Sequence, residues 1–233
     1  MNQEMRIAVV VLAAGSGSRF GQATNKVWLA LKGRRIISRS LSNAVKSFPS
    51  CRCVLVINPA DMSLAREVFR REVPEINAEF VDGADSRHES EYNALMYLAP
   101  VIEDGSINVV LIHDGARPLA TSKLFYDIAL TAHHHGGALP AIVVDPREMD
   151  IATEKQIVRV QTPQAFRAIE LLSAYKQAHD DNFIGTDTAA CMERYFPNIH
   201  CVAVAGEVQN MKITYPQDLL IAEHMLGMRE ITD

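Results

Sequence analysis

The sequence contains no long apolar run and no excess of positive charge, and each absence excludes a class of protein. No stretch approaches the roughly 20 apolar residues that span a bilayer, so we expect no membrane anchor. The formal net charge is −5, whereas general nucleic-acid binding requires a basic surface. Residues Met1–Arg6 are polar and lead directly into a predicted strand, which argues against a secretory leader. These features indicate a globular cytoplasmic protein that binds neither membrane nor nucleic acid.

Cysteine is also scarce, with four residues in 233. They lie within predicted strands or helices without metal-ligand spacing, at Cys51, Cys53, Cys191 and Cys201. We expect reduced, buried thiols, as is usual in the cytoplasm. The run His133–His135 does not indicate a metal site either, because adjacent side chains on a helix point in different directions. We expect it to form a solvated helix end.

Two common nucleotide-binding fingerprints are incomplete. Gly15 and Gly17 supply the first two glycines of G-x-G-x-x-G, but Phe20 occupies the third position. The acidic residue expected about 20 residues later to hold a ribose is missing, and arginines stand nearby instead. A Walker A loop is excluded because Gly-Lys-Ser/Thr does not follow. A nicotinamide enzyme and a P-loop enzyme are therefore both disfavoured.

The most informative segment that is present runs from Val10 to Leu31, with the sequence VVLAAGSGSRFGQATNKVWLAL. A buried strand is followed by a glycine-rich turn, then by Arg19 and Lys26. Glycines allow backbone N–H groups to approach a ligand closely, and two nearby cations suit a triphosphate. The segment predicts a nucleotide-phosphate loop. The alternative is a tight strand-to-loop turn without a ligand. Trp28 is expected to pack beneath the loop.

The hydrophobic pattern alternates between short β-branched runs and longer amphipathic segments, which predicts an α/β fold with a mostly parallel, Rossmann-like sheet covered by helices on both faces. The predicted strands are Ile7–Leu12, Arg52–Ile57, Ala78–Val81, Val109–His113, Gly137–Val144 and His200–Ala205. The predicted helices are Ile36–Lys46, Asp61–Arg71, Arg87–Leu98, Ser122–His133 and Ala168–His179. The polar stretch Asp145–Gln161 is expected to leave the sheet or to form an arm.

A second candidate site is LIHDGARPL, residues 111–119, where a strand ends at Asp114. A carboxylate at a strand end near a triphosphate loop suits Mg²⁺, a cation that prefers oxygen ligands. Arg117 is suited to binding a substrate phosphate. The structural alternative is that Asp114 caps the following turn and pairs with Arg117.

Four further segments follow predicted strands or open predicted helices. GADSRHES includes Gly83, Asp85, Arg87 and Ser90, although Ser and Asp are also ordinary helix caps. QTPQAF, residues 161–166, is read as a turn into a helix. Thr186 and Asp187 stand at a helix start, where capping alone would explain them. In NMKIT, Lys212 is predicted to end a short strand before a helix that begins at Pro216.

Together, the order and spacing of these motifs resemble the 2-C-methyl-D-erythritol 4-phosphate cytidylyltransferases of the non-mevalonate isoprenoid pathway. The resemblance extends from about Ile7 to Leu226 and rests on LAAGSGSR with Lys26, GADSRHES, HDGARP, QTPQAF, the Thr186–Asp187 pair and NMKIT. It implies one nucleotidyltransferase domain over residues 1–233, with a short dimerisation arm around residues 140–160. It also implies a homodimer that joins CTP to a polyol phosphate, uses Mg²⁺ and releases pyrophosphate.

The resemblance assigns roles position by position. Catalytic cations would be Arg19, Lys26 and Lys212. Residues contacting CTP would be Ala13, Ala14, Gly15, Ser16, Gly17, Ser18, Gly83, Asp85, Arg87 and Ser90. Residues on the substrate side would be Asp114, Arg117, Thr186 and Asp187, with Asp114 also the metal ligand.

The chain departs from the family pattern at several positions. Asn25 precedes Lys26 where relatives usually have proline, which predicts a less rigid loop. Gln209 stands where many relatives have an acid, so a second carboxylate on the metal is in doubt. At the arm position of a substrate-binding arginine the chain has Glu154, an acid that would repel a phosphate. Either Arg147 or Lys155 replaces that arginine, or substrate binding differs.

These departures keep two alternatives open. One is a sister enzyme that transfers CMP to ribitol 5-phosphate, which would share the CTP side of the site. The other is a catalytically weakened relative that binds nucleotide as a regulatory or scaffold subunit.

Overall fold

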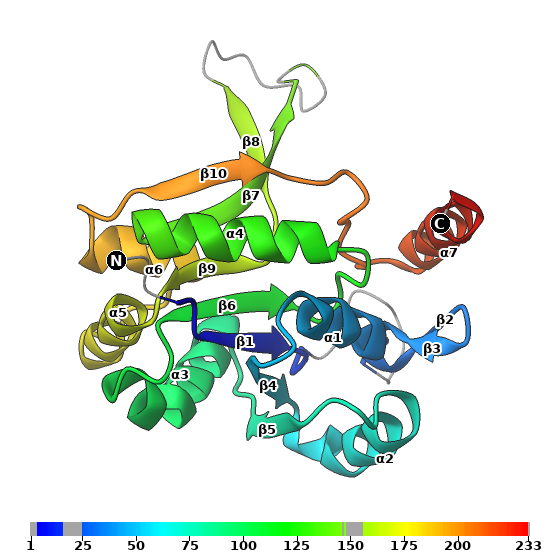
Figure 1. Ribbon diagram of the computed structural model, residues 1–233, viewed down its shortest axis with the longest axis horizontal. Coiled ribbons are helices and arrows are strands. Elements are labelled where there is room, and N and C mark those ends of the chain that lie inside the picture. Colours follow the sequence, from blue (N-terminus) through cyan, green and yellow to red (C-terminus); the bar gives the residue numbers. More distant parts are fainter. Residues whose placement is uncertain (1–3, 16–24, 146, 148–155, 233) are drawn as a thin grey trace.

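The predicted strands assemble into one mixed sheet that has eight strands within the described residues, 4–15, 25–145, 147 and 156–232 (Figure 1). This arrangement comes from a computed structural model of the chain. The path across the sheet is β10 (Cys201–Ala205), β7 (Gly137–Val144), β9 (Gln164–Arg167), β6 (Val109–Asp114), β1 (Ile7–Leu12), β4 (Arg52–Ile57) and β5 (Ala78–Asp82), with β8 (Ile157–Val160) paired to β7.

Most neighbouring strands are parallel, as predicted. β1 pairs in parallel with β4 and β6, β4 with β5, and β10 with β7. β9 is antiparallel to both β6 and β7, and β8 is antiparallel to β7. Because β1, β4, β5 and β6 run in one direction, their carboxyl ends open at the same edge of the sheet, where α/β proteins bind ligands.

Helices cover both faces of the sheet and bury alternate strand residues (Figure 1). Val9 and Val11 point into one core, and Ala8 and Val10 into the other. The first core is closed by α1 (Ile36–Ser47), α2 (Met62–Glu72) and α4 (Ser122–His135). The second is closed by α3 (Arg87–Glu103), α5 (Ala168–Asp180) and α6 (Thr188–Tyr195).

A third, smaller apolar cluster holds the C-terminal helix. α7 (Pro216–Thr232) buries Ala222 against Leu31 of β2 (Ala30–Leu31) and against Ile213. β2 forms a two-stranded ribbon with β3 (Arg34–Arg35). The helix that was predicted to begin at Pro216 is therefore confirmed.

The prediction that QTPQAF turns directly into a helix is wrong. Gln164–Arg167 form strand β9, and α5 begins only at Ala168. Ala165 and Phe166 are buried between β6 and β7. A four-residue strand is too short to show a period of two, which explains why the pattern did not reveal it.

The short strand predicted before Lys212 is also absent, since the described residues between β10 and α7 form no ladder. Ile213 donates a backbone hydrogen bond to the carbonyl of Ala116 at 2.9 Å, and this contact ties the segment to the end of β6. The segment is thus extended alongside the loop after β6 without becoming a strand.

The stretch Asp145–Gln161 leaves the body of the sheet, as expected. β7 and β8 form an antiparallel pair that projects beyond the other strands (Figure 1). Residues 146 and 148–155, which include Glu154 and Lys155, lie outside the described part of the chain. Arg147 pairs with Asp145 at the base of this segment and is largely exposed.

Several smaller features bear on the sequence predictions. No helix among the described residues is long and apolar enough to cross a membrane. The four cysteines are free thiols, although Cys51 lies just before β4 and, like Cys201, is only partly buried. His134 and His135 are exposed at the end of α4. Trp28 packs as expected, with 2% of its surface exposed.

Candidate active site

A cavity of about 480 Å³ opens at the carboxyl ends of β1 and β6. Its walls come from the end of β1, the turn that carries Lys26, the segment before α3, and the segment between β10 and α7. The sequence-predicted residues that line it are Ala13, Ala14, Gly15, Lys26, Asp85, Arg87, Ser90, Asp114 and Lys212. Ser16, Gly17, Ser18 and Arg19 lie outside the described residues.

Lys26 begins a 3₁₀ turn, η2 (Lys26–Trp28), that lies close to the end of β1. Asn25 caps this turn and lies beside Lys26 in the cavity wall. The turn is anchored on its far side, where the Trp28 indole N–H donates to Asp61 at 2.8 Å. A cation is therefore presented to the cavity from a turn with fixed ends.

The segment between β5 and α3 approaches the loop after β1 very closely. A Cβ atom at Gly83 would lie 2.1 Å from the Cβ of Ala14, so only glycine fits there without displacement. The Ser90 hydroxyl accepts a hydrogen bond from the Ala84 N–H at 3.0 Å and holds the segment against α3. Ser86 is the helix cap, with a reciprocal capping box to Glu89.

Arg87 extends from the first turn of α3 between two buried carboxylates. Its Nε lies 2.9 Å from Glu91 Oε1, and its guanidinium also pairs with Asp114. Glu91 is in turn held by the hydroxyls of Tyr175 and Thr188, which come from α5 and α6. Burial opposes the charge of Arg87, but Asp114 and Glu91 outweigh it and raise its pKa. Arg87 therefore stays cationic and orients Asp114.

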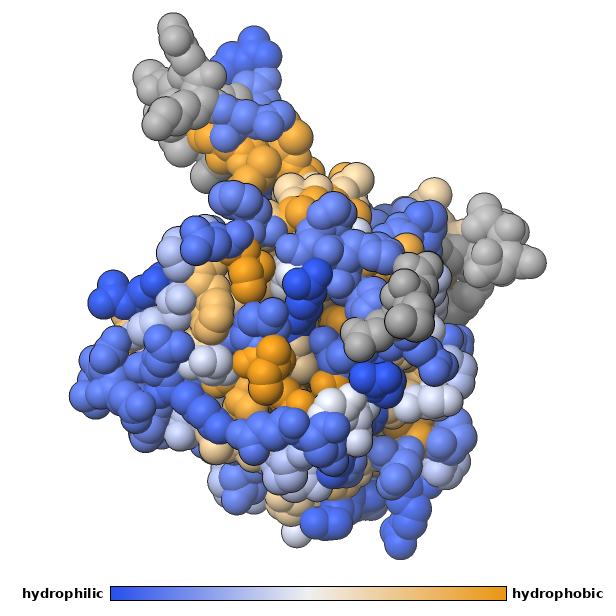
Figure 2. Space-filling view, turned by 60° about the vertical axis from the view of Figure 1, so that its left-hand side comes forward, coloured by the Kyte–Doolittle hydropathy of each residue, from blue (hydrophilic) through white to orange (hydrophobic). Residues whose placement is uncertain are grey.

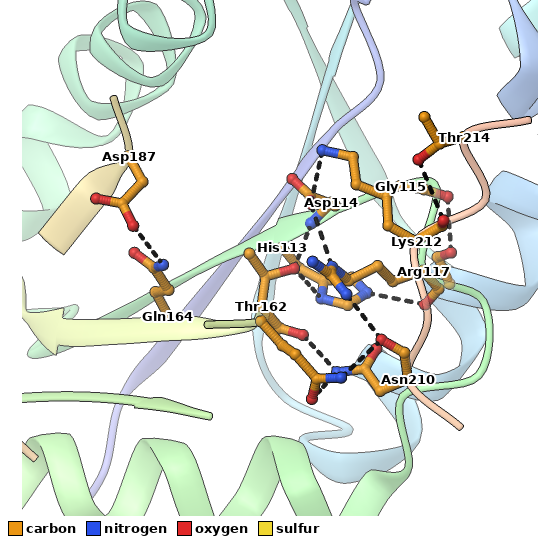
Figure 3. A network of polar contacts seen from close by, with 12 residues as sticks. His113, Asp114, Gly115, Arg117, Thr162, Gln164, Asp187, Asn210, Lys212 and Thr214 are labelled. Atoms are coloured by element: carbon orange, nitrogen blue, oxygen red, sulfur yellow. Dashed lines mark hydrogen bonds and ion pairs between the residues drawn. The ribbon is translucent and has the colours of Figure 1, made fainter. Parts of the chain in front are cut away.

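Asp114 is the centre of the site and is 5% exposed. Among the described residues its carboxylate pairs with Arg87, with Arg117 Nε at 3.2 Å and with Lys212 Nζ at 3.0 Å (Figure 3). Burial alone would raise the pKa of Asp114, but Arg87, Lys212 and Arg117 lower it well below its usual range. The carboxylate stays ionised. The three cations around it outnumber the two carboxylates of the cluster, Asp114 and Glu91. Such a cluster favours an anionic ligand.

His113 fixes the backbone on which Asp114 stands. Its Nε2 lies 3.2 Å from the Arg117 carbonyl, which only accepts, so Nε2 carries the proton. Nδ1 then accepts from the Thr162 hydroxyl at 3.2 Å, and the Thr162 oxygen accepts the Asp114 N–H at 3.0 Å (Figure 3). Burial lowers the pKa of His113 to about 4, and the ring is neutral at neutral pH.

Asn210 links the segment of Lys212 to the same network. Its Nδ2 donates to the Thr162 carbonyl at 2.8 Å, and its own carbonyl accepts from Arg117 at 2.7 Å and from Gln161 at 3.1 Å. The motifs QTPQAF and NMKIT stand out in the sequence, but they predict no role for Gln161, Thr162 or Asn210. Asn210 could have been found from its position two residues before Lys212, whereas nothing in the sequence next to Gln161 and Thr162 points to their role.

Asp187 has a different role from Asp114. Its carboxylate caps α6 through the Ala190 N–H at 2.9 Å and accepts from Gln164 at 3.1 Å. Figure 3 shows this pair apart from the cluster around Asp114. The capping alternative considered for Thr186 and Asp187 accounts for the bond from Asp187 to Ala190, and neither residue lines the cavity.

The fold and the cavity define a class, the α/β enzymes that bind nucleotide phosphates at the carboxyl edge of a parallel sheet. Comparison with known proteins identifies the family. The sequence pattern of the family described as 2-C-methyl-D-erythritol 4-phosphate cytidylyltransferase matches residues 7–228, and the chain belongs to this family of nucleotidyltransferases.

Individual relatives agree over nearly the full length. The chain is 33% identical over 230 residues to 2-C-methyl-D-erythritol 4-phosphate cytidylyltransferase of Bacillus mycoides, covering 95% of this chain and 98% of the relative. It is 35% identical over 233 residues to the enzyme of that name from Geobacillus kaustophilus, covering 97% and 99%.

Solved structures are similar as well. The 4-diphosphocytidyl-2C-methyl-D-erythritol synthase of Anaerococcus prevotii superposes with a TM-score of 0.78 at 23% identity and covers 96% of both chains, which supports the fold. The 2-C-methyl-D-erythritol 4-phosphate cytidylyltransferase of Thermus thermophilus superposes with a TM-score of 0.68 at 26% identity, covering 95% of this chain and 98% of that one.

Proposed function

We propose that this chain transfers CMP from CTP to 2-C-methyl-D-erythritol 4-phosphate and releases pyrophosphate, a step of isoprenoid biosynthesis. Membership of the family supports the reaction. The observation that carries the proposal is the buried Asp114 with Arg87, Arg117 and Lys212 around it, in a cavity that Lys26 also lines. At the carboxyl end of β6 the cations outnumber the carboxylates, and this excess of positive charge favours binding of both a triphosphate and a phosphate substrate.

In the proposed reaction a phosphate oxygen of the acceptor attacks the α-phosphorus of CTP in line. A new P–O bond forms as the bond between the α-phosphorus and the bridging oxygen breaks, and pyrophosphate takes the electron pair. The protein supplies positioning and charge stabilisation rather than covalent chemistry. Lys26 and Arg19 would stabilise the five-coordinate phosphorus and the leaving group, and Lys212 would contact phosphate from the opposite wall.

We assign the nucleotide to the side of the cavity formed by β1 and β5. The backbone N–H groups of residues 14–18 would bind the phosphates, and Gly83, Asp85 and Ser90 would contact the cytosine. Of these last three, Asp85 and Ser90 line the cavity. Arg87 would act through Asp114, because both its neighbours are carboxylates. Asp114 and Arg117 would face the ribose and the acceptor. Thr186 and Asp187 would support the acceptor side from the segment just before α6.

We include Mg²⁺ in the proposal with Asp114 as its protein ligand. Among the described residues, no group of three or more His, Cys, Asp or Glu side chains is arranged to hold a metal. Asp114 lines the cavity but shares its carboxylate with Arg87, Arg117 and Lys212, so Mg²⁺ would have to replace one of these cations. One carboxylate would then be enough, because Mg²⁺ in nucleotide sites is usually held by one or two carboxylates, substrate phosphates and waters. When bound, the metal would neutralise charge on the triphosphate.

We further propose that residues 1–233 form one domain and that two copies associate through the β7–β8 arm. Val143 and Val158 are exposed on this arm, at 63% and 44%. Figure 2 shows hydrophobic residues gathered along the projecting arm. An exposed apolar strand pair of this kind favours association.

A cytoplasmic location agrees with the free thiols of the four cysteines.

The test is a pyrophosphate-release assay of the purified chain with CTP, with and without each acceptor. Release with 2-C-methyl-D-erythritol 4-phosphate alone supports the proposal. Comparable release with ribitol 5-phosphate would move the chain to the sister activity. CTP binding with no release from either acceptor would contradict both and leave a nucleotide-binding regulatory protein.

A further inference from the structure

Asn25 lies directly before Lys26, and its side chain joins two segments of the cavity wall. Its Nδ2 donates to the Ala13 carbonyl at 2.6 Å, and its Oδ1 accepts the Val27 N–H at 3.3 Å. The residue is 8% exposed. A buried amide whose donor and acceptor are both engaged has little freedom to rotate. Its two hydrogen bonds therefore fix the backbone of Lys26 relative to the end of β1.

Both segments joined by Asn25 are themselves anchored. The Ala13 N–H donates to the Val56 carbonyl at 2.7 Å, which ties the end of β1 to β4. On the other side, the Trp28 N–H donates to the Asn25 carbonyl at 3.0 Å, and the Trp28 indole is held by Asp61. The expectation that asparagine leaves this loop less rigid is thus opposed by its side-chain contacts.

We propose that Asn25 is a positioning residue for the transfer reaction, acting through Lys26. This inference rests on the proposed function, in which Lys26 stabilises charge that develops at the α-phosphorus. Such a cation is useful only at the correct distance, and a misplacement of about 1 Å can lower a rate by about 100-fold. The hydrogen bonds of Asn25 hold that distance before the nucleotide binds.

Proline separates this role from direct contact with the nucleotide. Asn25 has φ −59° and ψ 125°, values that a proline ring adopts without strain. Asn25→Pro keeps the backbone direction into Lys26 but supplies no amide. The proline ring fixes φ by itself, so Asn25→Pro should restrain the backbone into Lys26 without the two hydrogen bonds and retain most of the activity that Asn25→Ala loses. If the amide contacts nucleotide, both variants should lose activity equally.

Asn108 offers a matched control. Its Nδ2 donates to the Glu4 carbonyl at 2.9 Å, and its Oδ1 accepts the Arg6 N–H at 2.9 Å. It therefore makes the same pair of side-chain-to-backbone hydrogen bonds at the amino end of β1, away from the cavity. Asn108→Ala should lose similar stability without a change in chemistry.

The experiment measures steady-state kinetics of the full chain with CTP and 2-C-methyl-D-erythritol 4-phosphate. We expect Asn25→Ala to lower kcat about 10- to 100-fold, with the KM for CTP changed less than about threefold. We expect Asn25→Pro to stay within about fivefold of the wild-type kcat, and Asn108→Ala to match it. Amide exchange at Val27–Leu29 should quicken in Asn25→Ala and not in Asn108→Ala.

Three kinetic results would overturn the inference: a wild-type kcat in Asn25→Ala, an equal loss in Asn108→Ala, or an equal loss in Asn25→Ala and Asn25→Pro. Failure of the proposed function looks different, because the wild-type chain itself would then release no pyrophosphate. Unchanged amide hydrogen exchange at Val27 in Asn25→Ala would also refute the inference, whatever the activity, because the side chain of Asn25 would then not restrain the turn.

Discussion

At the scale of single residues, the site depends on one buried carboxylate that forms ion pairs with three cationic side chains. Asp114 is held ionised by Arg87, Arg117 and Lys212, and His113 and Thr162 fix its backbone. The motif HDGARP reveals Asp114 and Arg117 from the sequence because the strand ends at Asp114 and Arg117 stands in the loop after it. The link to Arg87 was not predictable, since Arg87 stands 27 positions before Asp114 and its other partner, Glu91, is held by residues of α5 and α6.

The first prediction concerns Lys26. Lys26→Ala should lower kcat by about 10² to 10³, because a preorganised charge on a transition state contributes about 3–4 kcal/mol. Pyrophosphate release measures the rate, and circular dichroism checks the fold. Lys123→Ala is the control, since Lys123 is an exposed lysine on α4 that pairs only locally, with Asp127. An unchanged rate in Lys26→Ala would remove this residue from the mechanism.

A second prediction concerns the thiols. Burial raises the pKa of Cys51 to about 11 and the pKa values of Cys191 and Cys201 to about 12, and it also raises that of Cys53. At pH 8 roughly one Cys51 in a thousand is a thiolate, which is the reactive form. Iodoacetamide at pH 8 should therefore leave the native chain and its activity intact, while the denatured chain takes up four labels. Rapid native labelling would show that the thiols are accessible.

At the scale of elements, the period of the hydrophobic pattern predicted the parallel strands and their helices. Runs such as Ile7–Leu12 and Arg52–Ile57 match the observed strands because both their faces are buried. The hydrophobic pattern did not predict β9, because this strand has only four residues and is antiparallel to its neighbours. α3 extends past the predicted end at Leu98, through Pro100 to Glu103, because Ala99 and Ile102 continue its buried face.

The close contact between β5 and the loop after β1 gives a third prediction. Gly83→Ala places a Cβ 2.1 Å from Ala14, and the proposed phosphate loop must move to accommodate it. Overpacking costs about 1–3 kcal/mol, so we expect the KM for CTP to rise about tenfold or more. Gly227→Ala is the control, because its Cβ would meet only the flexible end of Lys32. Equal KM values in the two variants would contradict this packing.

At the scale of the whole molecule, the body of the sheet and the β7–β8 arm occupy separate places. The body forms the cavity, and the arm projects from the opposite end of the sheet path from β5 (Figure 1). The sequence predicted an arm from weak periodicity and polarity. It could not predict which arm residue would meet the acceptor, because in the proposed dimer that contact would be made by a second copy of the chain.

A fourth prediction tests association through the arm. Val143→Asp should convert a dimer into a monomer in sedimentation velocity, because a carboxylate would replace an apolar contact. Ile184→Asp, at a residue that is 64% exposed near α6, should leave the mass unchanged. A wild-type chain that sediments as a monomer would refute the proposed dimer.

The central claim is that this cavity transfers CMP to 2-C-methyl-D-erythritol 4-phosphate. Phosphorus NMR of the purified chain with CTP, Mg²⁺ and that acceptor tests it most directly, because the new phosphorus–oxygen–phosphorus linkage is seen in the product itself. We predict that the CTP signals give way to those of pyrophosphate and of a diphosphate diester, and that Lys26→Ala slows this conversion by about 10² or more. CTP that stays intact beside the acceptor, or that yields only CMP and pyrophosphate, would contradict the account.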